Sequence, residues 1–309
     1  MPGSLLSSLS LRLTPRHWPR AVLRVLLPSV CALCGGGCDD AVCPACTAAY
    51  ARLPGVRCGR CGNPLPSPPR IATSPPRRRG PHFACDAGSA NLGPCLRRDD
   101  AAERRDDAVE RRDDAVERRD DVDADGARIC GSCLAHPPAY DATVAAVDYA
   151  IPLDQLVLQL KFGARLALAP WCARQIRDAV LARPGLPLPD LLCPVPLGPG
   201  RLAERGFNQA LEIARPLAAL LGVACHAALA QRTTETPAQS GVAPDARARN
   251  VRGAFAIAAP DLVAGRHVGL VDDVMTSGHT LGELAAACKR FGAARVTNFV
   301  FARTPPHGK

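Results

Sequence analysis

The sequence predicts a mostly parallel α/β sheet with helices on both faces, accompanied by a small N-terminal cysteine-rich module. Three observations carry this prediction. From about residue 140 to residue 301, short apolar segments of strand length alternate with longer segments of helical spacing. One such strand, Val268 to Val271, runs into two acids, a small polar loop and a helix. Four Cys-x-x-Cys pairs lie before this region.

Composition limits the kinds of protein that this chain can be. The 309 residues, 47% of them hydrophobic, can bury one sizeable core and a smaller module. A net charge of +9 favours anionic partners, either phosphorylated metabolites or nucleic acid. No run of about twenty apolar residues occurs, so we expect no membrane span. Paired cysteines beside an α/β domain indicate a reducing compartment, and we expect a cytoplasmic protein.

The cysteine pairs have the spacing of zinc ligands. Two thiolates separated by two residues can converge on one tetrahedral ion, and four such pairs supply two complete sites. Buried free thiols or redox pairs are the alternative interpretation. We expect about two structural Zn²⁺ ions. Interleaved pairing is open as an alternative, and we favour sequential pairing, in which the first pair joins the second and the third joins the fourth. The ligands are then Cys31, Cys34, Cys43 and Cys46 for one site, and Cys58, Cys61, Cys130 and Cys133 for the other.

Changes in composition divide the chain into three parts. Residues 1–28 form a basic leader, residues 29–139 hold the cysteine pairs, and residues 140–305 hold the α/β domain. The cysteine module is interrupted at about residues 64–128 by a Pro, Ser and Arg-rich stretch and a seven-residue charged repeat that starts at Arg97. The repeat lacks an apolar seam, which favours a solvated helix over a coiled coil.

Within the α/β domain, periodicity predicts the elements in order. Strands are expected at Thr143 to Tyr149, Leu191 to Val195, Ala254 to Ile257, Val268 to Val271 and Val296 to Phe301. Helices are expected at Leu153 to Phe162, Leu166 to Leu181, from about Arg201 through Leu221, and at Leu281 to Phe291. The long polar stretch from Arg232 to Arg252 is predicted to be functional or disordered.

The loop after the acidic strand has the features of a phosphate site. Hydroxyls, successive backbone amides and one glycine precede a helix, whose N-terminus favours anions. The loop residues are Thr276, Ser277, Gly278, His279 and Thr280. Asp272 and Asp273 stand at the strand's carboxyl end, where carboxylates can accept hydrogen bonds from sugar hydroxyls. Phosphate and diol together indicate a ribose phosphate; a solvated acid pair before an ordinary helix cap is the alternative.

A ribose carrying a second phosphate group needs a second anion site. The segment from Val195 to Arg205 follows another strand's carboxyl end and offers two glycines and two arginines. Lys161, Arg205 and Arg247, with Arg249, are further candidate cations for a pyrophosphate. Mg²⁺ would normally share that charge.

These motifs resemble two related families. The arrangement of a strand, an Asp-Asp pair and a Thr-x-Gly-x-Thr loop resembles that of the type I phosphoribosyltransferases. In that family the loop holds the 5-phosphate of phosphoribosyl pyrophosphate, and the acid pair holds the ribose hydroxyls. The wider pattern resembles the ComF family of competence-associated proteins. It comprises the four cysteine pairs, Leu160 to Phe162, Arg205 to Gln209, Gln239 with Arg247 to Phe255, and Asp272 to Thr280. The resemblance implies a phosphoribosyltransferase fold behind a double zinc ribbon.

Three classes of function remain open at this point. The first is a phosphoribosyltransferase with an unknown acceptor, and we favour it, with Asp272 and Asp273 as the catalytic acids. The second, implied by the ComF resemblance, is a DNA-uptake factor that handles single-stranded DNA together with uptake machinery. The third is a scaffold whose zinc module docks a partner. The few aromatic residues are scattered, which disfavours a base-stacking platform.

Overall fold

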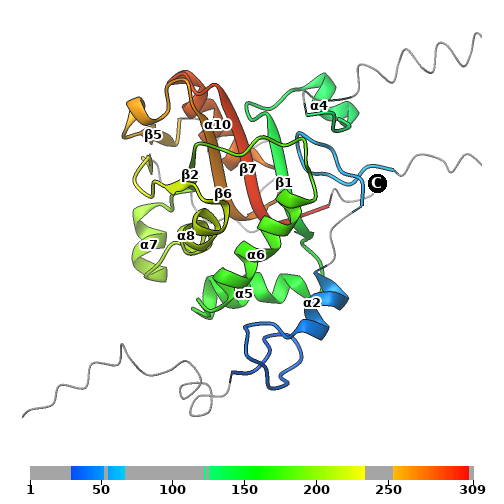
Figure 1. Cartoon of the computed structure of the whole chain (residues 1–309). Helices are drawn as coiled ribbons and strands as arrows, with labels where there is room; N and C mark the ends of the chain where they lie inside the picture. Colours follow the sequence, from blue (N-terminus) through cyan, green and yellow to red (C-terminus); the bar gives the residue numbers. More distant parts are fainter. Residues whose placement is uncertain (1–28, 52–54, 67–121, 123–124, 234–252, 306–309) are drawn as a thin grey trace, which may run out of the picture.

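A computed structural model describes residues 29–51, 55–66, 122, 125–233 and 253–305 (Figure 1). The leader, nearly all of the charged insertion, and the stretch 234–252 lie outside the described residues. Gln239, Arg247 and Arg249 fall in that last stretch, so their expected roles stay predictions.

The centre of the molecule is a five-stranded sheet in the order β1-β7-β6-β2-β3, and every pairing in it is parallel. Its strands are β1 (Ala142–Asp148), β2 (Leu191–Pro194), β3 (Ala224–Cys225), β6 (His267–Met275) and β7 (Arg295–Arg303). A separate antiparallel pair is formed by β4 (Ala230–Arg232) and β5 (Phe255–Ile257). The parallel sheet confirms the predicted fold class.

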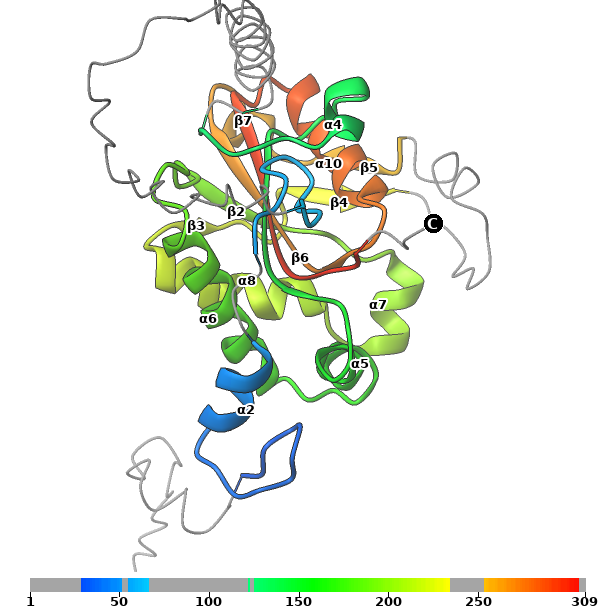
Figure 2. The ribbon, with the colours of Figure 1, turned by 90° about the vertical axis from the view of Figure 1, so that its right-hand side faces the viewer.

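Helices cover both faces of this sheet, as expected for parallel strands. The helices are α5 (Leu153–Phe162), α6 (Leu168–Leu181), α7 (Pro199–Arg205), α8 (Gln209–Leu221) and α10 (His279–Arg290), with short helices α2 (Pro44–Tyr50) and α4 (Gly131–Ala135) in the cysteine-rich part and a 3₁₀ turn η2 (Pro260–Leu262). The α5, α6 and α8 helices pack on one face, and α10 packs on the other with β5 (Figures 1 and 2). Two buried clusters lie on the two faces of the sheet, because side chains of a strand point alternately to either face. From β7, Phe299 and Phe301 belong to the cluster beneath α5, α6 and α8, and Val296 and Val300 belong to the cluster beneath α10.

Two elements differ from the sequence-based expectation near the site. The helix predicted from Arg201 through Leu221 is two helices, because Gly206 adopts a left-handed conformation with φ of 78° and Asn208 caps a new helix, its side chain accepting a hydrogen bond from Ala210 N. The strand predicted to end at Val271 continues to Met275, because Val274 and Met275 still pair with Ala302 and Arg303. The acid pair therefore lies within β6.

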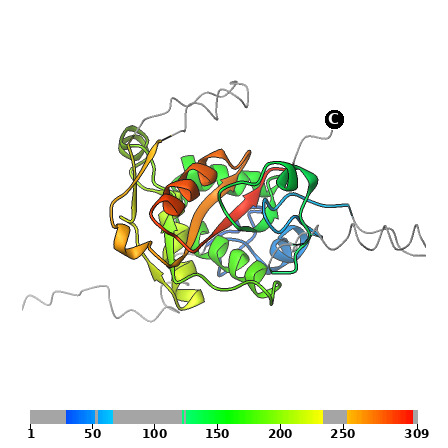
Figure 3. The same cartoon turned by 90° about the horizontal axis from the view of Figure 1, so that it is seen from above.

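The two cysteine-rich segments pack against the α/β core at one side of the sheet, and the β4–β5 hairpin lies at the other (Figure 3). Cys31, Val42 and Cys46 belong to the same buried cluster as α5 and α6. Trp171 of α6 donates from Nε1 to Thr47 Oγ1 at 3.1 Å. The second segment covers the edge strand β1, since Thr143 N donates to Gly59 O at 2.9 Å. Among the described helices, none has the length and apolarity that a membrane crossing requires.

Candidate functional site

The two acids of β6 have different surroundings, because successive residues of a strand point to opposite faces. Asp273 is 2% exposed and turns toward α5 and α8. Lys161 Nζ lies 2.7 Å from Asp273 Oδ2, and Gln209 Nε2 donates to Asp273 Oδ1 at 3.4 Å. Lys161, which the sequence suggested as a pyrophosphate cation, is thus an ion-pair partner of the acid pair in this structure.

A chain of contacts joins the separate sequence motifs into one cluster. Arg205 at the end of α7 donates to the side-chain oxygen of Gln209, and its guanidinium lies over the Phe162 ring, 5.3 Å from the ring centroid. Helix α5, which ends at Lys161 and Phe162, lies beside α7 (Figure 2). The motifs at residues 160–162, 205–209 and 272–273 are therefore brought together at the carboxyl half of β6.

Asp272 lies on the other side of β6 and has a different electrostatic environment. Burial and the neighbouring Asp273 raise the pKa of Asp272 well above its usual range, while Lys161 opposes this shift. Arg232 of β4 interacts electrostatically with Asp272. A carboxylate that is poorly solvated in this way gains from a ligand that donates hydrogen bonds to it. Sugar hydroxyls are such donors.

The loop between β6 and α10 keeps the expected open, glycine-dependent shape. Gly278 is the N-cap of α10 and has a φ of 83°. Thr276 and Ser277 are exposed, and Gly278, His279 and Thr280 are half-buried. A cavity of about 320 Å³ adjoins the loop, lined in part by Tyr140, Ser277, Gly278, His279 and Glu283. The backbone amides at the start of a twelve-residue helix and the nearby hydroxyls can therefore receive an anion.

The structure adds residues that sequence reasoning did not single out. Arg303, at the end of β7, is 5% exposed and donates to the carbonyls of Cys61 (2.9 Å), Met275 (3.0 Å) and Thr276. It connects the second cysteine cluster to the start of the loop. The Tyr140 hydroxyl lies against Gly278, 2.9 Å from where a Cβ would stand. For Arg303, the available signal was a charged residue directly after the apolar run from Phe299 to Ala302.

The eight paired cysteines form two clusters, in the predicted sequential pairing. Within each cluster the four sulfur atoms lie within 4.8 Å of one another. Cys34 and Cys43 sulfurs are 3.9 Å apart, and those of Cys61 and Cys130 are 3.7 Å apart. Four sulfurs at about 2.3 Å from one tetrahedral Zn²⁺ stand about 3.8 Å from each other. The donor sets and spacing fit structural zinc.

Backbone amides further favour the thiolate form that zinc requires. Cys43 N donates to Cys31 Sγ at 3.3 Å, and Cys130 N donates to Cys58 Sγ at 3.3 Å. Burial by itself raises the pKa of Cys31, but hydrogen bonds from backbone N–H groups outweigh it and lower the pKa to about 6. The second cluster is the more deeply buried of the two, since Cys34 of the first cluster is exposed.

Comparison with protein families agrees with the cysteine clusters. The family model for a double zinc ribbon domain matches residues 22–77. Among solved structures, a glutamine phosphoribosylpyrophosphate amidotransferase from B. subtilis has a TM-score of 0.28 at 17% identity, covering 44% of this chain and 26% of its own. A purine phosphoribosyltransferase from Pyrococcus horikoshii has a TM-score of 0.22 at 15% identity, covering 46% and 87%. Scores this low carry no argument, and the fold is established by its strand pairing.

Sequence relatives are much closer. DNA utilization protein YhgH of Salmonella typhi and of Escherichia coli (strain K12) are each 40% identical to this chain over 178 residues, which is 57% of this chain and 78% of each relative. Competence protein F of Haemophilus influenzae is 32% identical over 182 residues, covering 57% of this chain and 79% of that protein. At this identity and coverage, the chain belongs to the ComF family, together with the YhgH proteins.

Proposed function

We propose that the protein binds phosphoribosyl pyrophosphate, or a related ribose phosphate, at the site between β6 and α10. One observation carries the proposal: three motifs that are distant in sequence meet just before the N-terminus of α10. They meet because Lys161 and Gln209 both contact Asp273 of the acid pair. Asp272 and Asp273 accept hydrogen bonds from the ribose hydroxyls in this proposal. The loop Thr276 to Thr280 binds the 5-phosphate.

The residues support a phosphoribosyl transfer rather than a proton-transfer reaction. Substitution at the anomeric carbon breaks the bond to pyrophosphate and forms a bond to the acceptor, through an oxocarbenium-like state. The chain's contribution is to hold the ribose and to stabilise the departing charge. Arg205, which contacts Gln209 beside the acid pair, is a candidate cation for the pyrophosphate, and Arg247 is a second candidate from sequence. Mg²⁺, bound with the pyrophosphate, would share its charge.

The cellular role that fits the family is the handling of DNA. The relatives are named as a DNA utilization protein and a competence protein. We infer a role in DNA uptake or use, in the cytoplasm, with single-stranded DNA and uptake machinery as partners. A DNA-binding factor without catalysis is the second candidate, favoured by those names alone.

Calorimetry with phosphoribosyl pyrophosphate and Mg²⁺ tests the proposal. Asp272→Asn removes an anionic acceptor and keeps the volume, so affinity should fall about tenfold or more. Asp178→Asn is the matched control, because Asp178 pairs with Arg177 on α6 and is remote from the loop. Equal affinity of parent and Asp272→Asn would mean that β6 does not hold the ribose.

A second titration separates the two candidate functions. Ser277→Ala and Thr280→Val remove hydroxyls from the loop, and both should weaken ribose 5-phosphate as well as the full donor. Single-stranded DNA is then added as a competitor. If the DNA displaces phosphoribosyl pyrophosphate, the two ligands share one surface. If the parent binds the DNA tightly and shows no measurable binding of phosphoribosyl pyrophosphate, the DNA-binding factor without catalysis is favoured and the phosphoribosyl pyrophosphate proposal is overturned.

A further inference from the structure

A second cavity, of about 380 Å³, lies where the second cysteine-rich segment meets the edge of the sheet. Arg57 and Arg128 come from that segment, and Arg183 follows the end of α6. Small residues of β1 and α6 complete its wall. Strand β7 separates β1 from β6, and no residue of the acid pair or the loop lines this cavity. It is therefore separate from the site proposed above.

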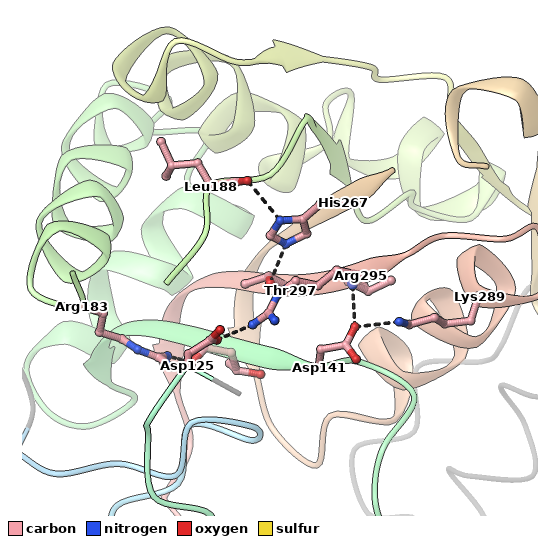
Figure 4. Close-up of polar contacts among 10 residues, drawn as sticks. Asp125, Asp141, Arg183, Leu188, His267, Lys289, Arg295 and Thr297 are labelled. Carbon is pink, nitrogen blue, oxygen red and sulfur yellow. Dashed lines mark hydrogen bonds and ion pairs between the residues drawn. The ribbon is translucent and has the colours of Figure 1, made fainter. Parts of the chain in front are cut away.

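The lining of this cavity is cationic. Its described lining residues include three arginines and no acid. Of the acids nearby, Asp125 pairs with Arg295, and Asp148 pairs with Arg57 at 2.6 Å and offsets the charge of that one lining arginine. Figure 4 shows the Arg183 side chain extending from the end of α6 toward the segment that carries Asp125. Guanidinium groups gathered around a partly enclosed space concentrate positive potential there.

Two of the arginines also have donors that no described residue uses. Arg57 Nε and Arg183 Nη2 are buried and have no hydrogen-bond partner among the described residues. Other donors of the same groups hold them in place, since Arg57 Nη1 donates to Gly62 O at 2.8 Å and Arg183 Nη1 donates to Thr143 O at 3.0 Å. These carbonyl contacts fix the two guanidinium groups beside the cavity, so little side-chain ordering is needed when an anion binds there.

From this geometry we propose that the cavity binds a phosphomonoester. A terminal phosphate has three free oxygens and nearly two negative charges, which match several guanidinium forks better than a singly charged group does. The volume is in the range of small-molecule sites, and the walls of Ala145, Ala179 and Ala182 can accept the carbon part of an ester. A free mononucleotide and the 5′-phosphate end of a DNA strand both present this chemistry.

Hydrogen exchange on the full, zinc-loaded chain locates the binding, because phosphate can also occupy the loop before α10. The probes are thymidine 5′-monophosphate and one oligonucleotide, prepared with a 5′-phosphate and with a 5′-hydroxyl. We expect slower exchange in peptides covering residues 55–62, 125–130 and 179–186 with a phosphomonoester. Protection by the mononucleotide identifies the free ester as a ligand, and protection by the phosphorylated strand alone identifies a DNA end.

Substitutions complete the test. Arg128→Gln and Arg183→Gln should each weaken the binding that gives this protection by about tenfold or more. Arg128 is exposed, so its replacement carries little risk to folding. Arg177→Gln on α6 is the matched control, because Arg177 is paired with Asp178 and does not line the cavity. The proposal is overturned if these peptides show no protection, if the 5′-hydroxyl strand protects them equally, or if all three variants behave alike.

Discussion

The adjacent acids of β6 are unequal at the level of single residues. Asp273 has a cation 2.7 Å away and an amide donor, so its charge is compensated inside the protein. Asp272 is adjacent to that charge, and burial with the repulsion from Asp273 raises its pKa. Asp272 accepts from Asp273 N at 2.9 Å and is attracted by Lys161 and Arg232, but its burial and the repulsion from Asp273 outweigh these contacts. We therefore expect Asp272 to contribute more to ligand binding than to stability.

This difference predicts a pH-dependent stability effect of Asp272→Asn. The folded pKa of Asp272 lies above its unfolded value of about 3.9, so between the two pKa values the folded state binds more protons. The parent therefore loses stability as pH rises through this window, and the neutral Asn does not. Urea unfolding from about pH 5 to about pH 8 should show the advantage of Asp272→Asn growing with pH. A pH-independent stability difference between the parent and Asp272→Asn would contradict the assignment.

At the level of elements, the N-terminus of α10 depends on one glycine. Gly278 has a φ of 83°, and a Cβ there would stand 2.6 Å from Met275 Cε and 2.9 Å from the Tyr140 hydroxyl. Backbone conformation and space both exclude a side chain. Gly282, one turn later in the same helix, would bring a Cβ only to 3.9 Å from the Tyr140 ring.

These two glycines make a matched pair of substitutions. Gly278→Ala should lower the free energy of unfolding by roughly 1–3 kcal/mol, because it strains the backbone and displaces two side chains. Gly282→Ala should be neutral or raise it by roughly 0.5–1 kcal/mol, because alanine favours a helix interior. Chemical denaturation measures both. Equal effects of the two substitutions would show that the left-handed cap is not required.

At the level of the whole molecule, Arg303 joins the second metal site to the candidate phosphate loop. Its Nε donates to Cys61 O, and its Nη1 donates to Met275 O at 3.0 Å and to Thr304 O at 2.7 Å. A lysine ammonium cannot reproduce this fork. Arg303→Lys should lower stability by roughly 1–3 kcal/mol and weaken ribose 5-phosphate binding, with the zinc content unchanged. Arg290 lies on the exposed side of α10, so Arg290→Lys should leave stability, ribose 5-phosphate binding and zinc content unchanged. If Arg303→Lys also leaves all three unchanged, Arg303 does not link the second metal site to the loop.

Zinc content tests how the charged insertion relates to the metal module. The Cys61 and Cys130 sulfurs are 3.7 Å apart although 69 residues separate them in the chain. Replacing residues 67–121 by a short Gly/Ser linker should therefore leave about two zinc ions per chain, because none of the ligands lies in that range. In the same background, Cys58→Ser should reduce zinc toward one ion. Elemental analysis measures both, and a loss of zinc on linker replacement alone would mean that the insertion helps to form the site.

The sequence by itself determined the elements and motifs whose signals are local. Apolar periodicity predicted α5 at its observed bounds, and the Cys-x-x-Cys spacing predicted two four-sulfur clusters, although not which pairs join. These succeed because a helix face and a two-thiolate turn depend on residues a few positions apart. The acid pair and the loop before α10 were found in the same way.

Only the tertiary structure decided which of these groups meet. Lys161 pairs with Asp273 because α5 ends where β6 carries its acids, and Arg303 reaches both Cys61 and Thr276 because β7 ends between them. The break at Gly206 escaped prediction because a single glycine within apolar helical spacing is a weak stop signal. Contacts between residues more than a hundred positions apart follow from strand order and packing, which no local pattern encodes.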